Sequence, residues 1–198
     1  MMIQEYASAE VAAGSRMPEF SLYENTIHNV SIRYPSNWNK QEILLNNDHS
    51  ILQVMFALPI AARFSKAEDS ETISEKIRHI IYNQSSAVVV LNLKELHIDE
   101  TPTLQTVTNN HIHTLRICFD NVNVLENSYN HKIEQTSYSK LIYTYTDPLQ
   151  NLLKKEGMQI ISVTDHKEIS ITYNSQTQDF DTFLPTVNRM IGTLSIEV

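Results

Sequence analysis

Val30-Ser-Ile-Arg-Tyr-Pro-Ser-Asn-Trp38 is the stretch of the sequence that says most about the fold. Apolar and polar residues alternate up to Tyr34, as they do in a strand with one buried face. Pro35 ends this strand because it holds the preceding residue extended and lacks a backbone N–H for a neighbouring strand. A second alternating stretch, residues 20–23, precedes it across an Asn-containing turn. We therefore predict a β-hairpin that leads into a loop carrying Trp38.

Further strands are predicted on both sides of the middle of the chain. Residues 42–45 and 50–58 form a second pair around a polar turn, and we expect them to continue one local antiparallel sheet with the hairpin. The β-branched run from Ala87 predicts a buried central strand that reaches about His97. The last third of the chain adds strands at residues 122–127, 139–146, 158–164 and 168–173.

Three helices interrupt these strands. Apolar residues at helical spacing predict the first, which ends near Gln84 and is capped either by Asp69-Ser70 or by Thr72; if Thr72 is the cap, Glu75 completes a capping box. The second runs over residues 102–116, where Thr101 caps the helix and proline takes its first position. The third starts at Pro185, with only a turn before it. Because hairpins dominate the order, the fold class is α+β, an antiparallel β-sheet flanked by helices.

The length of 198 residues and the hydrophobic content of 41% fit one domain with one core. No apolar run reaches the roughly 18 residues that a membrane-spanning helix needs. Residues 1–18 have no clear period and are predicted to be a flexible leader before a domain at 19–198. Their small residues resemble the neighbourhood of a signal cleavage site, although no basic and apolar regions precede them. Either a signal peptide was removed or none existed; we favour removal and an extracytoplasmic location.

Composition excludes several kinds of function. The formal net charge of −8 would repel phosphate backbones and anionic lipid, so nucleic acid and membrane surfaces are not expected partners. The three glycines lie far apart, which excludes the clustered glycines of dinucleotide and P-loop sites. The motifs of hydrolase nucleophile elbows, zinc proteases and EF-hands are also missing from the sequence. We therefore expect no enzyme activity.

Cys118 is the single cysteine, so an internal disulfide and a cysteine-rich zinc site are excluded. It lies in an apolar run, and we expect a small core residue rather than a reactive thiol.

Five segments give the chain a resemblance to a known family. They are Phe20-Ser-Leu-Tyr-Glu-Asn25, Val30-Ser-Ile-Arg-Tyr-Pro-Ser-Asn-Trp38, Tyr138-Ser-Lys-Leu-Ile-Tyr-Thr-Tyr145, Met158-Gln-Ile-Ile-Ser-Val163 and Phe183-Leu-Pro-Thr-Val-Asn-Arg-Met-Ile191. From about Phe20 onward the chain resembles the PsbP-like family, whose prototype is the extrinsic subunit of the photosystem II oxygen-evolving complex. It looks more like the short prokaryotic or archaeal members than the plant subunit.

The resemblance implies an α/β/α sandwich, a fold shared with a regulator that binds the nuclear-transport GTPase Ran. It also implies a non-enzymatic binding or scaffolding module that assists a protein complex, with a protein or membrane-associated partner. We expect a monomer. Residues 61–86 depart from the family pattern as an extra stretch. Since the fold alone does not carry function, a photosystem role does not follow from the resemblance.

Tyr34 and Trp38 are candidates for a partner surface, because they could form an aromatic corner beside the proline. The alternative is that these aromatic rings plug the edge of the core.

His97, Asp99 and Glu100 place one nitrogen and two carboxylates at the end of a predicted strand. This set suits a weak site for zinc, calcium or manganese, although further ligands would have to come from elsewhere. The alternative function is therefore a metal-binding accessory protein or a weak metal-dependent hydrolase, and the alternative for these residues is a solvated loop. His111 and His113 form a His-x-His pair, but a helix would splay their side chains by about 200°.

Overall fold

The structure is a computed structural model that describes residues 18–45, 51–59, 86–96, 102–133, 136–148, 153–164 and 166–196. Its elements in chain order are β1 (Phe20–Asn25), β2 (Val30–Pro35), β3 (Asn39–Leu45), β4 (Ile51–Ala57), β5 (Ala87–Glu95), α2 (Leu104–Cys118), β6 (Asp120–Ile133), β7 (Thr136–Asp147), β8 (Leu153–Thr164), β9 (Lys167–Gln176), α3 (Phe180–Ile191) and β10 (Ser195–Ile196). The predicted helix at 72–84 lies outside the described residues, as do almost all of the predicted leader at 1–18 and of the extra stretch at 61–86. Neither described helix is long and apolar enough to cross a membrane.

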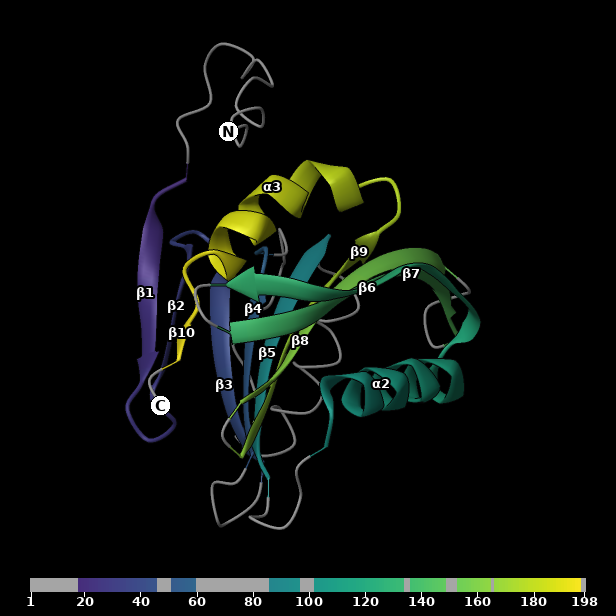
Figure 1. The fold of residues 1–198 in the computed structure, drawn as a ribbon. Helices are drawn as coiled ribbons and strands as arrows, with labels where there is room; N and C mark the ends of the chain where they lie inside the picture. Colours follow the sequence, from purple (N-terminus) through teal and green to yellow (C-terminus); the bar gives the residue numbers. More distant parts are fainter. Residues whose placement is uncertain are drawn as a thin grey trace, which may run out of the picture.

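The strands form two antiparallel sheets, not the single sheet predicted from the sequence (Figure 1). The larger sheet has the order β3-β4-β5-β9-β8-β7-β6, and the smaller has the order β1-β2-β10. The predicted hairpin exists, with Phe20 opposite Pro35 and Asn25 opposite Val30. However, it pairs with the end of the chain, where Ile196 lies opposite Val30. A pairing over this sequence distance leaves no local signal in the sequence.

Different elements pack against the two faces of the large sheet. On β8, Ile160 packs on one face and its neighbour Ile161 on the other, as the alternation of a strand requires. The face of Ile160 is covered by α3 and the small sheet, and the face of Ile161 by α2 (Figure 1). The α/β/α layering therefore holds in part, because a second sheet shares one outer layer with α3.

The second helix begins two residues later than predicted. Thr103 is its N-cap, and the Thr103 hydroxyl accepts a hydrogen bond of 3.1 Å from the backbone N–H of Thr106. Pro102 precedes this cap and does not occupy the first helical position. Thr101 and Thr103 are both of a residue type that favours the N-cap position, so the sequence pattern alone could not decide which of them caps the helix.

The last helix starts at Phe180, so the prediction that it begins at Pro185 was wrong. The backbone N–H groups of Thr182 and Phe183 donate to the carbonyl of Asp179, at 3.1 and 3.4 Å. Proline inside the helix removes one such bond, which usually costs about 3 kcal/mol. Burial of apolar side chains on both sides of the proline offsets this cost, since Phe180 and Val187 are buried in the core.

Candidate functional site

An apolar groove lies on the face of the large sheet that also carries α3. Its volume is about 40 Å³, and its walls come from β7, β8, β9 and the end of the chain. The lining residues are Thr136, Tyr138, Ile160, Ser162, Ile169, Ile171, Leu194 and Ile196. A wider hollow of about 240 Å³ at the turn between β1 and β2 is lined mainly by polar side chains. The apolar groove is therefore the better candidate for contact with another molecule.

Strand register creates the floor of this groove. Tyr138 lies opposite Ser162, and Ser162 lies opposite Ile169, so these three side chains point to the same face. The Ser162 hydroxyl donates to the carbonyl of Ser137 at 2.8 Å, which satisfies its polar group beside the apolar walls. Ile160 and Ile171 form the next row in the same way.

The other wall is the segment that follows α3. The backbone N–H of Arg33 donates to the Thr193 hydroxyl at 2.9 Å, and Ile196 pairs with Val30. These contacts hold Leu194 and Ile196 beside the large sheet, where both pack against the core. Because β10 ends the order β1-β2-β10 in the described small sheet, its outer edge borders the groove.

Polar residues of β6 continue the same face beyond Tyr138. The ring of His131 stacks on Tyr138 with centroids 5.2 Å apart, and His131 Nε2 lies 2.8 Å from the Ser128 hydroxyl. This hydroxyl donates to Glu126 at 2.7 Å, and Lys140 donates to the same carboxylate at 3.1 Å. The hydrogen bond from Ser128 lowers the pKa of Glu126, and Lys140 adds to the effect. These four polar residues, Glu126, Ser128, His131 and Lys140, form what we call the polar rim.

The rim contains a serine, a histidine and a carboxylate, which the sequence analysis did not bring together. Its geometry differs from that of a catalytic triad, in which the acid holds the histidine and the histidine takes the proton of the serine. Here the single proton of the Ser128 hydroxyl goes to Glu126, so His131 must donate to the serine oxygen. The order of the three groups, carboxylate to serine to histidine, therefore differs from that of a catalytic triad.

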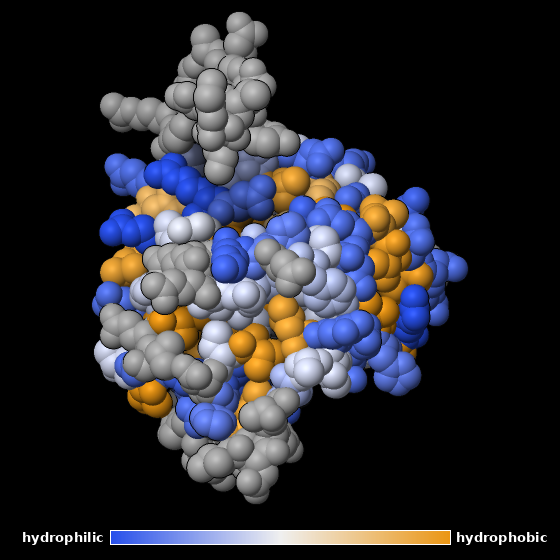
Figure 2. Space-filling view, viewed as in Figure 1, coloured by the Kyte–Doolittle hydropathy of each residue, from blue (hydrophilic) through white to orange (hydrophobic). Residues whose placement is uncertain are grey.

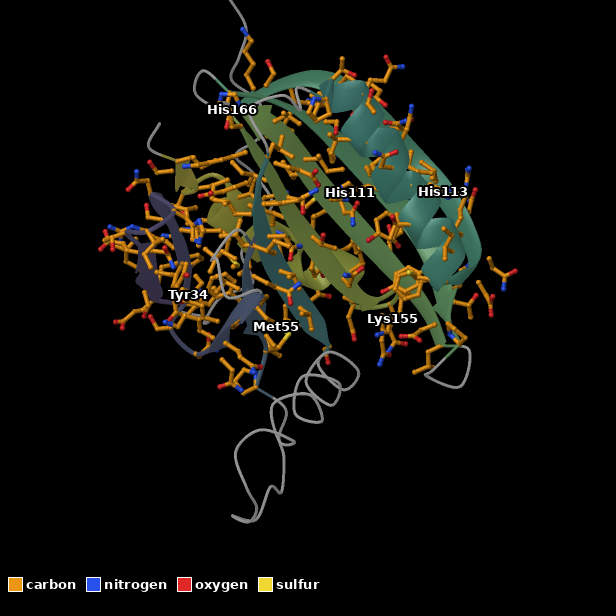
Figure 3. All side chains as sticks on the ribbon, turned by 90° about the horizontal axis from the view of Figure 1, so that it is seen from below. Tyr34, Met55, His111, His113, Lys155 and His166 are labelled. Atoms are coloured by element: carbon orange, nitrogen blue, oxygen red, sulfur yellow. The ribbon has the colours of Figure 1, made fainter. Side chains whose placement is uncertain are left out.

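A second polar cluster is buried on the opposite face. The hydroxyls of Tyr143 and Tyr145 both donate to Asn174 Oδ1, at 3.3 and 3.2 Å. Lys155 lies at the same end of the sheet (Figure 3), and burial lowers its pKa while the charge of Asp147 opposes that shift. Both charged side chains are nearly inaccessible to solvent, with 4% and 3% exposed. Tyr143 and Tyr145 belong to the hydrophobic core under α2.

The predicted metal residues His97, Asp99 and Glu100 lie outside the described residues. Within the described part of the chain, no group of three or more His, Cys, Asp or Glu side chains could hold a metal ion. His111 and His113 are both on α2, as predicted, and point to different sides of the helix (Figure 3). His111 faces the sheet and contacts Glu168, whereas His113 is exposed.

Trp38 is 6% exposed and belongs to the hydrophobic core, where its ring meets that of Phe183 edge to face at 6.5 Å. Tyr34 is half-buried and lies against Phe56, with ring centroids 4.8 Å apart. Of the two residues predicted for a partner surface, Trp38 is therefore part of the core. Tyr34 keeps part of its surface open to solvent.

The expectation that Cys118 is a core residue was wrong. It is the last residue of α2 and is exposed. The apolar run around it divides between faces, since Leu115 is buried while Ile117 is 71% exposed. A run of apolar residues in a helix cannot all face one side.

Apolar side chains reach the surface in small groups separated by polar ones on the side shown in Figure 2. Among the described residues, the exposed large apolar side chains come from different parts of the chain and are Leu22, Ile27, Ile117, Leu125 and Leu153. Scattered residues of this kind are normal on a protein surface, so they do not compete with the groove as a candidate site.

Sequence reasoning missed the groove. Tyr138 and Ile160 stood out only as parts of strands, and Leu194 only as the end of a helical stripe. The alternation Leu194-x-Ile196 after the helix was the one available signal, since it is typical of a short strand with one apolar side.

No family profile and no curated protein matches the sequence. Among solved structures, the cyanobacterial PsbP (CyanoP) from Synechocystis sp. PCC 6803 is similar with a TM-score of 0.61 at 11% identity, over 96% of this chain and 99% of that chain. The chain has the PsbP-like fold. The Ran-binding protein Mog1p of Saccharomyces cerevisiae gives a TM-score of 0.52 at 7% identity, over 91% of this chain and 96% of that chain. A Pseudomonas aeruginosa protein of unknown function gives 0.52 at 9% identity, over 90% and 98% of the two chains.

Proposed function

We propose that this chain is a non-enzymatic binding module that assists a protein complex, and that it contacts its partner through the apolar groove beside β10. The observation that carries the proposal is the groove itself, which joins apolar walls to the outer edge of a short strand. An extended segment of a partner could add to such an edge by backbone hydrogen bonds and place one side chain in the groove. A volume of about 40 Å³ suits a small apolar side chain.

Two further observations support a binding role. The polar rim presents Lys140, Glu126 and His131 next to the groove, where they could set the direction of a bound segment. The similar protein Mog1p is described as Ran-binding, so a protein partner is compatible with this fold. We propose that the chain acts as a monomer in an extracytoplasmic compartment.

The test compares proteins captured by the purified chain with those captured by two variants. Ile196→Asp places a charge in the groove wall, and Leu22→Asp places the same charge on β1, where the side chain is 47% exposed and outside the groove. We expect Ile196→Asp to lose the partner and Leu22→Asp to retain it, with both variants melting as cooperatively as the parent. Equal capture by Ile196→Asp and the parent would argue against the groove as the binding site.

The second candidate is a metal-binding accessory protein or a weak metal-dependent hydrolase built on His97, Asp99 and Glu100. It is supported by the described end of β5, where Glu95, two residues before His97 in the sequence, lies 3.6 Å from the buried His28. Zinc, calcium or manganese that binds only the folded state would raise the melting temperature of metal-free protein. Loss of that rise in His97→Ala or Asp99→Ala would favour this candidate, and no rise with any of the three ions would reject it.

A further inference from the structure

Lys140 places a positive charge at the edge of the apolar groove. It lies opposite Ile160 in the pairing of β7 with β8, so both side chains point to the face that carries the groove. Tyr138, two residues earlier on β7, lines the groove on the same face. The Cβ atoms of directly opposite residues such as Lys140 and Ile160 are about 4.5–5.5 Å apart. The charge therefore begins one residue away from an apolar wall of the groove.

The negative charge of the polar rim lies one row further along the sheet. Glu126 lies opposite Ile142, which lies opposite Met158, outside the set of residues that line the groove. The Glu126 carboxylate accepts from the Ser128 hydroxyl at 2.7 Å and from the Lys140 ammonium group at 3.1 Å. An ammonium group has three N–H donors, so Lys140 can hold Glu126 and a second carboxylate at the same time. A group that enters along the groove therefore reaches Lys140 before Glu126.

The edge strand beside the groove is short. β10 has two residues, Ser195 and Ile196, so a partner segment can pair with it over only a short length. The hairpin end of β6 and β7 reaches β10, since Thr136 and Ile196 line the same groove (Figure 1). A segment that pairs with β10 meets the polar rim within a few residues. The end of a chain suits this arrangement better than the middle of a long strand.

The end of a chain also supplies the charge that matches Lys140. In an extended segment, the next side chain on the same face is about 7 Å away, whereas the terminal carboxylate is attached to the same Cα as the last side chain. We propose that the groove binds the C-terminal residue of a partner chain, with a small apolar side chain in the groove and the α-carboxylate on Lys140. This inference rests on the proposed function and specifies which part of a partner the groove accepts.

The experiment compares two acetylated tripeptides, Thr-Thr-Val with a free C-terminal carboxylate and the same peptide as a C-terminal amide. Each is titrated into the full ¹⁵N-labelled chain at a fixed neutral pH, and the amide shifts in the NMR spectrum give the dissociation constants. We expect the free acid to bind about tenfold more tightly than the amide, because the amide lacks the charge-assisted hydrogen bond to Lys140.

Substitutions in the rim should act in opposite directions. Lys140→Gln should reduce the affinity for the acid to that for the amide. Glu126→Gln should tighten binding of the acid, because Lys140 then has no competing carboxylate in the rim. Lys132→Gln removes the same charge from an exposed side chain on the other face of β6, so it is the matched control and should leave both affinities unchanged. Ile196→Asp should lose both peptides, and thermal unfolding verifies that each variant is folded.

Three results would overturn this inference. They are equal binding of the acid and the amide, no shift of groove residues with the acid at millimolar concentration, and weaker binding of the acid by Glu126→Gln. The last result would assign a positive group of the partner to the rim. Each of them leaves the proposed function to its own test, because loss of the captured partner in Ile196→Asp would still identify the groove as the binding site.

Discussion

The Nε2 atom of His111 lies 2.9 Å from Oε1 of Glu168, and this contact fastens α2 to β9. Both side chains are 21% exposed, so solvent screens the pair only in part. We predict that His111→Ala lowers the free energy of unfolding by about 1 kcal/mol, because Glu168 keeps its charge but loses its partner. Urea denaturation measures the loss. His113→Ala, on the exposed side of the same helix, is the matched control and should change little.

The same contact predicts a pH dependence. The hydrogen bond from His111 lowers the pKa of Glu168 below its value in the unfolded chain, which is about 4.3. The stability gained from this lowered pKa is present above about pH 4.3 and is lost as the pH falls through the folded-state pKa. Urea midpoints over a pH series should therefore separate the parent from Glu168→Gln above that pH and bring them together below it. A constant difference down to the lowest pH would contradict this origin.

Gly157 is the position where the core tolerates no added carbon. A Cβ there would lie 2.5 Å from Cζ of Tyr143 and 2.7 Å from Oδ1 of Asn174. We predict that Gly157→Ala destabilises the protein by about 3 kcal/mol, because it displaces a buried ring and its hydrogen-bond acceptor. At Gly192 the nearest atom is 3.4 Å away and φ is −65°, so Gly192→Ala should be nearly neutral in thermal unfolding. Equal effects of the two changes would disprove the argument.

Trp38 provides a test of the core plug. Trp38→Ala should lower the free energy of unfolding by about 3–5 kcal/mol, as the replacement of a large aromatic residue by alanine does in protein cores. Since it is the single tryptophan, its fluorescence reports unfolding of the parent directly, and circular dichroism must serve for Trp38→Ala. Leu22→Ala removes an exposed apolar side chain and should cost far less. A small loss in Trp38→Ala would instead favour the surface interpretation.

Cys118 should react as an exposed thiol. We expect an aromatic disulfide reagent to modify one thiol per chain in the folded protein, at a rate close to that in denaturant. Cys118→Ser should show no reaction. Modification that requires denaturant would mean that the residue is protected.

The sequence was sufficient for features that depend on local pattern. Alternation located the hairpin before Pro35, and the β-branched run from Ala87 located a strand in the interior of the large sheet. Helical spacing located α2 and α3, with errors at Thr103 and Phe180 because the ends of a helix depend on single hydrogen bonds. The resemblance to PsbP-like proteins in short segments agreed with the fold.

The sequence was insufficient for features that join distant segments. The pairing of Ile196 with Val30 created both the small sheet and the groove wall, and the short alternation at Leu194 and Ile196 does not identify the strand with which they pair. The approach of His28 to Glu95 depends on two turns meeting across the sheets. The rim residues Glu126 and His131 come together across irregular pairing in β6, which shifts the faces of a strand in a way that alternation cannot predict.

The irregular pairing of β6 also makes this strand a poor template for backbone pairing with another copy of the chain. β6 ends the large sheet, and its register with β7 shifts between Asp120 and Asn123, between Val124 and Glu126, and between Ser128 and His131. Each shift bends the strand and interrupts the row of outward backbone groups that another copy would need as a template. Among the described residues β6 is the terminal strand of the large sheet, and a terminal strand interrupted three times is a poor template for pairing with another copy of the chain.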